Sequence, residues 1–133
     1  MSLAYSCILI AVLLPYVWIC FAKFGRQPDG SKLRYNNHTP RLQQAQMDGR
    51  AARAVGAHQN AFEALPAFAV AVLIAVQAGV PAAQVNIAAV VFIVARILHG
   101  VCYLADLPRA RSLSWVVGLL SVIALFVMAL RLV

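Results

Sequence analysis

Long uncharged stretches alternate with short polar ones along this chain. No charged residue occurs between residues 2 and 22, between Glu63 and Arg96, or over residues 112–130. Because about twenty apolar residues in a helix cross the hydrocarbon core of a bilayer, this pattern predicts membrane-spanning helices. The predicted spans are residues 2–22, 49–79, 81–105 and 111–132.

Residues at the ends of these stretches fit helix boundaries. Asp48 precedes the second span and can cap it, while Gly79 ends that span and Pro81 opens the next. The only long polar segment, residues 23–47, is too short for a domain and is predicted to be a loop. The fold class is therefore an all-α membrane protein, a single domain over residues 1–133 built as an up-down bundle of four transmembrane helices.

The amino-acid composition indicates that lipid, rather than water, surrounds much of this bundle. Hydrophobic residues make up 63% of the chain and charged residues 11%, against about 25% charged in ordinary soluble proteins. A small domain keeps a large share of its surface exposed, so it cannot hide that much apolar area from water. The partners of these surfaces are membrane lipids.

The net charge of +7 is concentrated in the first polar segment. Seven of the eleven basic residues are Lys23, Arg26, Lys32, Arg34, Arg41, Arg50 and Arg53. No nucleic-acid recognition motif accompanies them, and a basic loop between two spans suits anionic lipid headgroups, so nucleic acid is excluded as a partner. The positive-inside rule places loops one and three in the cytoplasm and both termini outside.

Cysteine, histidine and tryptophan positions add little chemistry. Cys7, Cys20 and Cys102 lie in apolar segments without a CxxC spacing, and we interpret them as small buried hydrophobes rather than disulfide or zinc ligands. No HExxH or similar spacing indicates a metal site. Trp18 and Trp115 are predicted to be interfacial or lipid-facing anchors.

Two stripes of polar residues interrupt the apolar spans. At 100° per residue, Arg53, Asn60 and Glu63 share one face of the second helix. The stripe on the third helix comprises Arg96, His99 and Tyr103. Ionisable groups inside a membrane are costly, which makes each of them a functional candidate.

The simplest arrangement pairs Glu63 with Arg96. Such a pair either locks the bundle by neutralising both charges or belongs to an anion site. Arginines at this end outnumber the acids: Arg50, Arg53, Arg96, Arg109 and Arg111 against Asp48, Glu63 and Asp106. Surplus guanidinium groups suit a small anionic ligand held by bidentate contacts. We interpret His58 and His99 as structural hydrogen-bonding residues rather than catalysts.

Two motifs carry a family resemblance that covers essentially the whole chain. They are "RAVGAHQNAFEALPAF" in the second span and "ARILHGVCYLADLPRARSLSW" across the third span and the start of the fourth. With them the chain resembles the MAPEG proteins, the membrane-associated proteins in eicosanoid and glutathione metabolism. The resemblance implies a left-handed four-helix bundle that forms a homotrimer and binds glutathione between subunits near the cytoplasmic face. It also suggests a bacterial inner membrane as the location.

The resemblance implies roles for particular residues. The residues expected to bind glutathione are Arg53, His58, Asn60, Glu63, Arg96 and Tyr103. Arg111 and Ser112 match the family's Arg-Ser pair at the start of helix four, where the arginine stabilises the thiolate of glutathione. Arg109 competes for that role, and the serine after Arg111 favours Arg111. Glutathione is then the cosubstrate, and the second substrate is a lipophilic electrophile or a lipid hydroperoxide.

Departures from the family pattern leave other functions open. Several glutathione-binding members have a basic residue where this chain has Gln59, and Arg50 or Arg41 would have to substitute. One alternative is a non-enzymatic membrane protein that binds a lipid or small anion in the intersubunit cleft. Another is a small exporter with Glu63 as a proton-coupled site, although a carboxylate near one end of the span, among arginines, is atypical of transporters.

Overall fold

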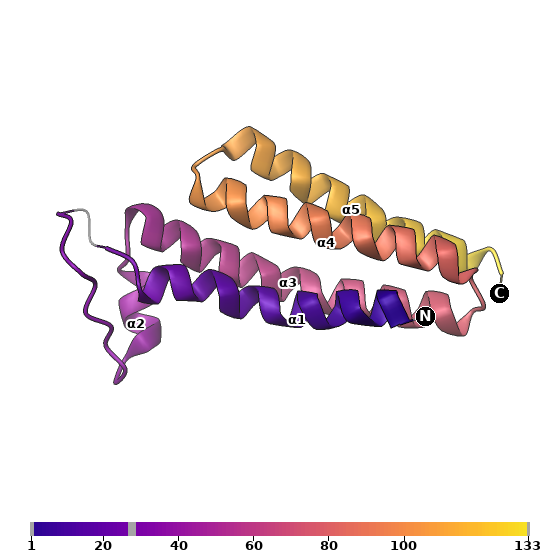
Figure 1. Cartoon of the computed structure of the whole chain (residues 1–133), viewed down its shortest axis with the longest axis horizontal. Helices are drawn as coiled ribbons and strands as arrows, with labels where there is room; N and C mark the ends of the chain where they lie inside the picture. Colours follow the sequence, from indigo (N-terminus) through magenta and orange to yellow (C-terminus); the bar gives the residue numbers. More distant parts are fainter. Residues whose placement is uncertain (1, 27–28, 133) are drawn as a thin grey trace.

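The computed structural model describes residues 2–26 and 29–132 of the chain. Its helices are α1 (Ser2–Lys23), α2 (Pro40–Ala45), α3 (Gly49–Gln77), α4 (Ala82–Leu104) and α5 (Pro108–Leu130). Within this described part, four helices are long and apolar enough to cross a membrane. They run alternately up and down with both termini at one end (Figure 1), which confirms the all-α four-span bundle.

The spans match the thickness of a bilayer. At about 1.5 Å per residue, the 23 residues of α4 extend roughly 35 Å, slightly more than a hydrocarbon core of about 30 Å. α3 has 29 residues, so its first turns extend beyond the apolar layer at the end where α2 lies. The polar residues at the start of α3 are therefore outside the hydrocarbon.

The short helix α2 was not predicted, because six residues are too few to show a helical period. Pro40 occupies its first turn, where a missing N–H costs no hydrogen bond. The side chain of Gln43 then ties the helix to the preceding segment. Its Nε2 donates to the carbonyl of Arg34 at 2.9 Å, and its Oε1 accepts from the amide of Asn36 at 2.8 Å.

The helix ends follow the sequence signals in part. Gly79 has a φ of 82°, and Val80 N–H donates back to the carbonyl of Ala75 at 3.0 Å, a stop that only glycine adopts easily. Asp48 occupies the N-cap position of α3, but its side chain makes no capping hydrogen bond there, contrary to expectation. α5 begins at Pro108 rather than at residue 111, since proline is well suited to the first helical turn.

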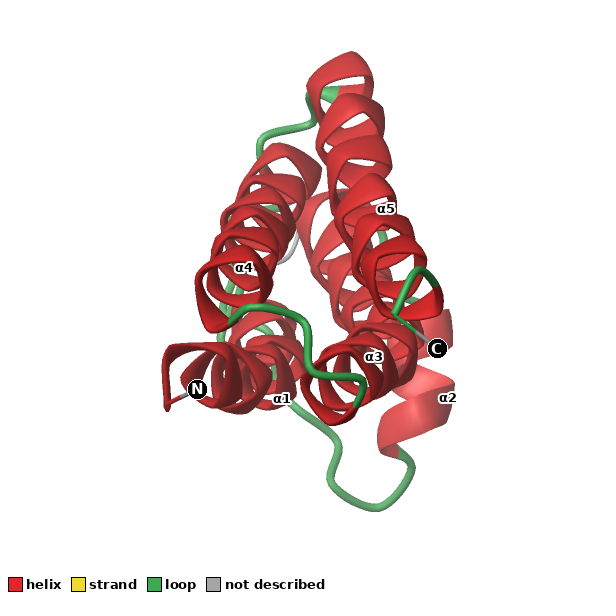
Figure 2. Cartoon of the chain, turned by 90° about the vertical axis from the view of Figure 1, so that its right-hand side faces the viewer, coloured by secondary structure: helices red, strands yellow, loops and turns green. Residues whose placement is uncertain are grey.

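The α4–α5 hairpin tilts away from α1 and α3 toward the end that carries α2 (Figures 1 and 2). The kinds of buried residue between the hairpin and the other helices differ along the bundle. Small residues are buried near the termini: Ala4, Ala71, Ala75, Ala89 and Ala129. Toward α2 the helices are separated by larger groups, including Trp18, Arg96 and His99. The bundle is thus closely packed at one end and wider, with buried polar residues, at the other.

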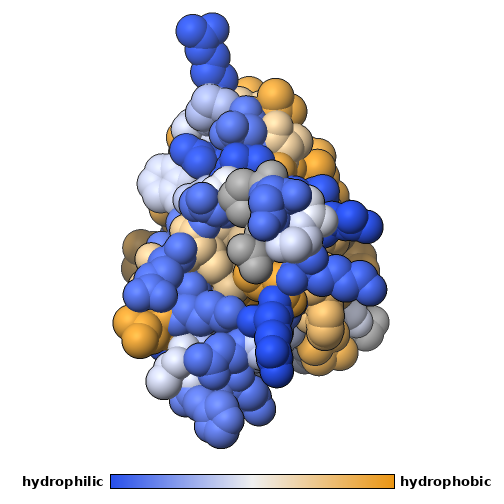
Figure 3. All heavy atoms as spheres, turned by 90° about the vertical axis from the view of Figure 1, so that its left-hand side faces the viewer, coloured by the Kyte–Doolittle hydropathy of each residue, from blue (hydrophilic) through white to orange (hydrophobic). Residues whose placement is uncertain are grey.

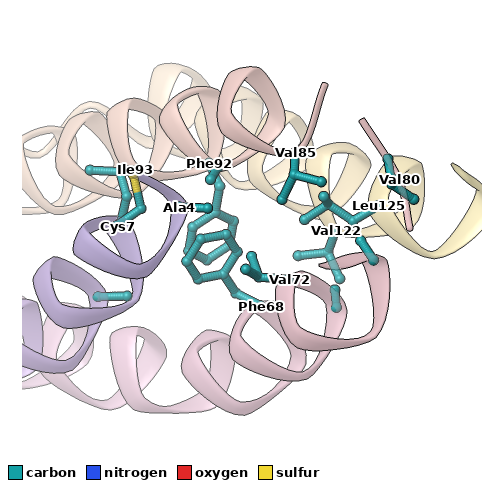
Figure 4. Packing of buried hydrophobic residues seen from close by; sticks show 14 of the residues in the cluster. Ala4, Cys7, Phe68, Val72, Val80, Val85, Phe92, Ile93, Val122 and Leu125 are labelled. Atoms are coloured by element: carbon teal, nitrogen blue, oxygen red, sulfur yellow. The ribbon is translucent and has the colours of Figure 1, made fainter. Parts of the chain in front are cut away.

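The apolar core fixes α3 against α4 and α5. The rings of Phe68 and Phe92 stack with centroids 3.8 Å apart and planes 7° from parallel (Figure 4). Val72, Val122 and Leu125 belong to the same buried cluster. This cluster lies on the terminal side of Arg96 and anchors the helices that carry the polar stripes.

Two minor sequence predictions were wrong. Trp18 is only 6% exposed and is not a lipid-facing anchor, because Gly100 opens a space on α4 that its indole fills. Cys20 is exposed rather than buried, because it falls outside the stripe of α1 that faces the bundle. Cys7 is on that stripe and is buried as expected.

The contact between Trp18 and Gly100 predicts a stability effect. A Cβ atom at position 100 would lie 2.2 Å from the indole ring. We expect Gly100→Ala to lower the melting temperature of the detergent-purified protein by roughly 5–10 °C, the effect of overpacking a filled core. Gly118→Ala is the matched control, because its Cβ would meet the Arg96 side chain at an ordinary 3.5 Å. Equal melting temperatures for the two variants would contradict this account.

Candidate functional site

Arg96 is the centre of the polar cluster inside the bundle. Arg96 lies on α4 and is only 4% exposed. Its Nη2 donates to the backbone carbonyl of Asn60 at 3.1 Å and to the side-chain Oδ1 of Asn60 at 2.6 Å. A buried guanidinium needs such partners, since burial of an unpaired charge is strongly unfavourable. Asn60 thus supplies two oxygens from α3 to one nitrogen of Arg96.

Asn60 also links Arg96 to Glu63. Its Nδ2 donates to Glu63 Oε2 at 3.2 Å, so the amide presents oxygen to the cation and hydrogen to the carboxylate. The direct ion pair between Glu63 and Arg96 that the sequence suggested is not formed, since the structure places Asn60 between them. The exposed Glu63 carboxylate retains acceptor capacity for a ligand.

A cavity of about 200 Å³ lies beside this chain of contacts. Its walls come from α3, α4 and α5, and the residues that matter most are Asn60, Glu63, Phe92, Arg96, Trp115 and Gly118. Gly118 leaves room for the Arg96 side chain, whose Cδ would lie 3.5 Å from a Cβ there. Trp115 was not predicted to line a site, although Trp115, Gly118 and Val122 follow the helical spacing of a single face.

Tyr103 and Arg111 form a second cluster, outside that cavity. The guanidinium carbon of Arg111 lies 4.4 Å from the centroid of the Tyr103 ring, a cation–π contact. On α3, Gly56 allows the phenol to approach, because a Cβ at that position would lie 2.6 Å from Tyr103 Oη. Tyr103 therefore contacts both α3 and the first turns of α5.

His99 fixes the start of α5 relative to α4. Its Nδ1 lies 3.1 Å from the carbonyl of Arg111, which can only accept, so Nδ1 carries the proton. Its Nε2 is buried and has no hydrogen-bond partner among the described residues. The ring packs edge-on against Tyr103, with centroids 5.6 Å apart. His99 thus positions the backbone of Arg111.

The turn between α4 and α5 holds Arg53. Asp106 adopts a left-handed backbone with φ of 58°, a conformation that aspartate tolerates better than most residues, and Leu107 N–H donates back to the carbonyl of Cys102 at 2.9 Å. This turn presents Asp106 Oδ2 to Arg53 Nη1 at 3.6 Å. Arg53 is therefore engaged in an ion pair with the exposed Asp106 and does not line the cavity around Arg96.

Two further predicted site residues are hydrogen-bonded elsewhere. His58 is buried, and its Nδ1 donates to the carbonyl of Pro15 at 2.7 Å, which attaches α3 to α1. Ser112 is exposed, and its Oγ donates to the carbonyl of Pro108 at 3.0 Å within α5. Among all predicted residues, the structure brings Asn60, Glu63 and Arg96 together at one cavity and Tyr103 with Arg111 beside it.

The chemistry of the cavity suits an anionic organic ligand. Its one basic group is buried and its one acid is exposed, and apart from the Asn60 amide the remaining walls are largely apolar. In the described part of the chain, no three His, Cys, Asp or Glu residues gather in a way that could hold a metal ion. Hydrophilic side chains predominate at the end of the molecule beyond the cavity, with hydrophobic patches between them (Figure 3).

A comparison with protein families supports the two motifs. The model of the MAPEG family matches residues 3–131. The chain belongs to the MAPEG family. It is therefore an integral, multi-pass membrane protein with a function related to glutathione or eicosanoid metabolism. No curated protein matches the chain. Membership in the MAPEG family confirms the resemblance inferred from the residues around Asn60 and Arg96.

Proposed function

We propose that this MAPEG protein is a glutathione-dependent transferase or peroxidase that acts on lipophilic electrophiles. The observation that carries the proposal is the buried Arg96, hydrogen-bonded to Asn60 at the wall of a cavity that also exposes the carboxylate of Glu63. Glutathione carries two carboxylates and one ammonium group. Arg96 can bind one of the carboxylates, and Glu63 can accept hydrogen bonds from the ammonium group.

The size of the cavity supports a site shared between subunits. A volume of about 200 Å³ is below the roughly 300–1,000 Å³ of typical small-molecule sites. Glu63 and Trp115 lie at its exposed side. A tripeptide bound to Arg96 would extend past these two residues, where a neighbouring subunit can complete the site. The proposal therefore includes the homotrimer, with one cleft at each subunit boundary.

Arg111 is the proposed stabiliser of the thiolate. A thiol with a pKa near 8.5 is only a few per cent ionised at pH 7, and a nearby guanidinium favours the anion. Arg111 is half-buried and held on the ring of Tyr103 rather than paired with an acid, so its charge is free to act on a ligand. In the present conformation the Ser112 hydroxyl donates its hydrogen bond to the carbonyl of Pro108. The Ser112 side chain must therefore rotate before it can donate to the glutathione sulfur.

The reaction follows from this arrangement. The glutathione sulfur attacks an electrophilic carbon, a C–S bond forms, and the leaving group departs with the bonding electron pair. With a lipid hydroperoxide, the sulfur attacks the distal oxygen and the lipid alcohol is released. A second glutathione then converts the sulfenic acid to a disulfide and water. The lipophilic substrate enters from the adjoining bilayer, and the apolar walls of the cavity can contact it.

Orientation follows from charge. The basic residues gather at the end that carries α2, and both termini lie at the other end (Figure 1). The positive-inside rule then puts the α2 end, with Arg111 and the mouth of the site, in the cytoplasm. Glutathione is a cytosolic thiol, so this orientation gives it direct access to the cleft.

Binding and turnover of the detergent-purified protein test the proposal. We expect saturable glutathione binding by equilibrium dialysis and conjugation of chlorodinitrobenzene at a rate above the uncatalysed reaction. Native mass spectrometry should show a trimer, and a clean dimer would refute the proposed homotrimer. Absence of binding at millimolar glutathione would refute the enzyme and favour the alternative, a non-enzymatic protein that binds a lipid or small anion in the cleft.

A further inference from the structure

A second, larger cavity lies at the α2 end of the molecule. It has a volume of about 570 Å³ and opens between the end of α1 and the start of α3. It shares no lining residue with the cavity around Arg96. Its lining includes Phe21, Phe24, Arg26 and Arg50. None of these residues lines the cavity around Arg96, although the sequence offers Arg50 as one substitute for the basic glutathione anchor that is missing at Gln59.

One side of this cavity is apolar and exposed. Phe21 is 43% exposed in the last turns of α1, and Phe24 directly after the helix is 84% exposed. Exposure of so much of an aromatic ring to water is unfavourable in a soluble protein. Here, however, the ring lies where a membrane span ends. Leu13, Val17 and Phe21 are all exposed and follow one another at helical i, i+4 spacing. This stripe gives the apolar side of the cavity a continuation into the bilayer.

The other side is basic and largely unpaired. Arg50 makes no hydrogen bond or ion pair with any residue that the structure describes. Arg26 Nη1 donates to the carbonyl of Gly30 at 3.3 Å, and its remaining donors face no acid within ion-pair distance in the described chain. Asp48 lines a neighbouring cavity that Arg26 also lines, and it forms no ion pair with Arg26. Two guanidinium groups at one cavity favour a phosphate or another multiply bonded anion.

We propose that this cavity binds the phosphodiester headgroup of an anionic phospholipid. Arg26 and Arg50 hold the phosphate, and an acyl chain lies along the stripe formed by Phe21, Val17 and Leu13. A soluble anion would use the two arginines but would leave Phe24 in water. The combination of a basic side, an aromatic side and a position at the end of a span therefore favours a lipid. The proposal does not depend on glutathione binding at Arg96.

Native mass spectrometry of the full-length protein tests this site. The protein is purified in a mild detergent and exchanged with phosphatidylglycerol or phosphatidylcholine of identical acyl chains. Each arginine near an anionic headgroup contributes about a fivefold preference, so Arg26→Gln/Arg50→Gln should reduce retention of phosphatidylglycerol by roughly 30-fold. Retention of phosphatidylcholine should change little. Lys32→Gln/Arg109→Gln is the matched control, since it removes the same charge from exposed positions at the same end.

Further variants and competition experiments distinguish a bound lipid from a soluble anion in this cavity. Arg26→Lys/Arg50→Lys, which keeps the charge, should retain most of the selectivity, and an unchanged melting temperature shows that the variants are folded. If the control variant loses as much selectivity as Arg26→Gln/Arg50→Gln, the lipid is attracted by the overall positive charge of this end. The proposed binding at the cavity would then be wrong. Displacement of the lipid by millimolar inorganic phosphate or glutathione would assign the arginines to a soluble anion and overturn the proposal. Persistence of the lipid under both conditions supports it.

Discussion

Replacement of Arg96 by alanine is expected to weaken glutathione binding by roughly 100-fold. Arg96 is the only basic residue that lines its cavity among the described residues, and it is buried away from water. A charge-assisted pair between a buried guanidinium and a carboxylate is stronger than a neutral hydrogen bond, and its loss corresponds to about 3 kcal/mol. Equilibrium dialysis with the detergent-purified variant measures the effect directly.

Two comparisons make the Arg96 experiment specific. Arg96→Lys keeps the charge but cannot hold both a carboxylate and the two oxygens of Asn60 in the same planar geometry, so an intermediate loss of about tenfold is expected. Arg131→Ala removes a charge at the opposite end of the bundle and should leave binding unchanged. If Arg96→Ala binds glutathione as tightly as Arg131→Ala does, Arg96 has only a structural role and the proposed ligand site is wrong.

The fold was predictable because a bilayer imposes strong constraints on sequence. Apolar length determined the four spans, and Gly79 with Pro81 located the boundary between α3 and α4. The helix α2 was missed because its order depends on side-chain contacts of Gln43 with the segment around Arg34, which leave no periodic signal. Trp18 was misplaced because its burial depends on Gly100, a residue on another helix.

The sequence predicted the polar residues that line the candidate site, but not which of their polar atoms are hydrogen-bonded to one another. Helical periodicity put Asn60 and Glu63 on one face, and the cost of charge in a membrane drew attention to Arg96. Periodicity cannot decide which polar atom meets which, and the structure inserts the Asn60 amide between the two charges. Trp115 gave no polar signal in the sequence, and only the packing of α5 against α3 and α4 shows that it lines the same cavity as Arg96.

A polarity gradient along the bundle connects fold and proposed function. Stacked phenylalanines and buried alanines pack the core of the terminal half. The wider half holds Arg96 and His99, each satisfied in part by backbone carbonyls from another segment. Because these carbonyls belong to α3 and α5, the positions of the polar groups are set by helix packing. The helices thus position the site, while the surrounding apolar surface is exposed to lipid.

Replacement of Arg111 by alanine is expected to reduce glutathione conjugation by roughly 100-fold while glutathione affinity changes by less than about threefold. Loss of one preorganised group that stabilises a developing or resting anion typically costs this much in turnover. Arg111 rests on the ring of Tyr103 and lines no part of the cavity around Arg96, so it contributes little to binding of the carboxylates. Initial rates with chlorodinitrobenzene and equilibrium dialysis separate the two effects.

The pH dependence of the Arg111 variant identifies its role. If the guanidinium stabilises the thiolate, its removal shifts the apparent pKa of bound glutathione upward, toward the value near 8.5 of the free thiol. The variant should therefore regain activity as the pH rises, whereas a variant that only disrupts packing should not. Arg111→Lys should restore part of the rate at neutral pH, because an ammonium group also favours the anion.

Arg109→Ala completes the Arg111 experiment, because Arg109 is the other arginine in the first turn of α5. Arg109 is exposed and makes no ion pair with a described residue, whereas Arg111 is held half-buried by Tyr103 and by the turn that His99 stabilises. A fixed charge stabilises an anion better than a mobile one, since no ordering is needed when the anion forms. We therefore expect the rate loss and the pKa shift in Arg111→Ala alone, and the opposite result would transfer the thiolate role to Arg109.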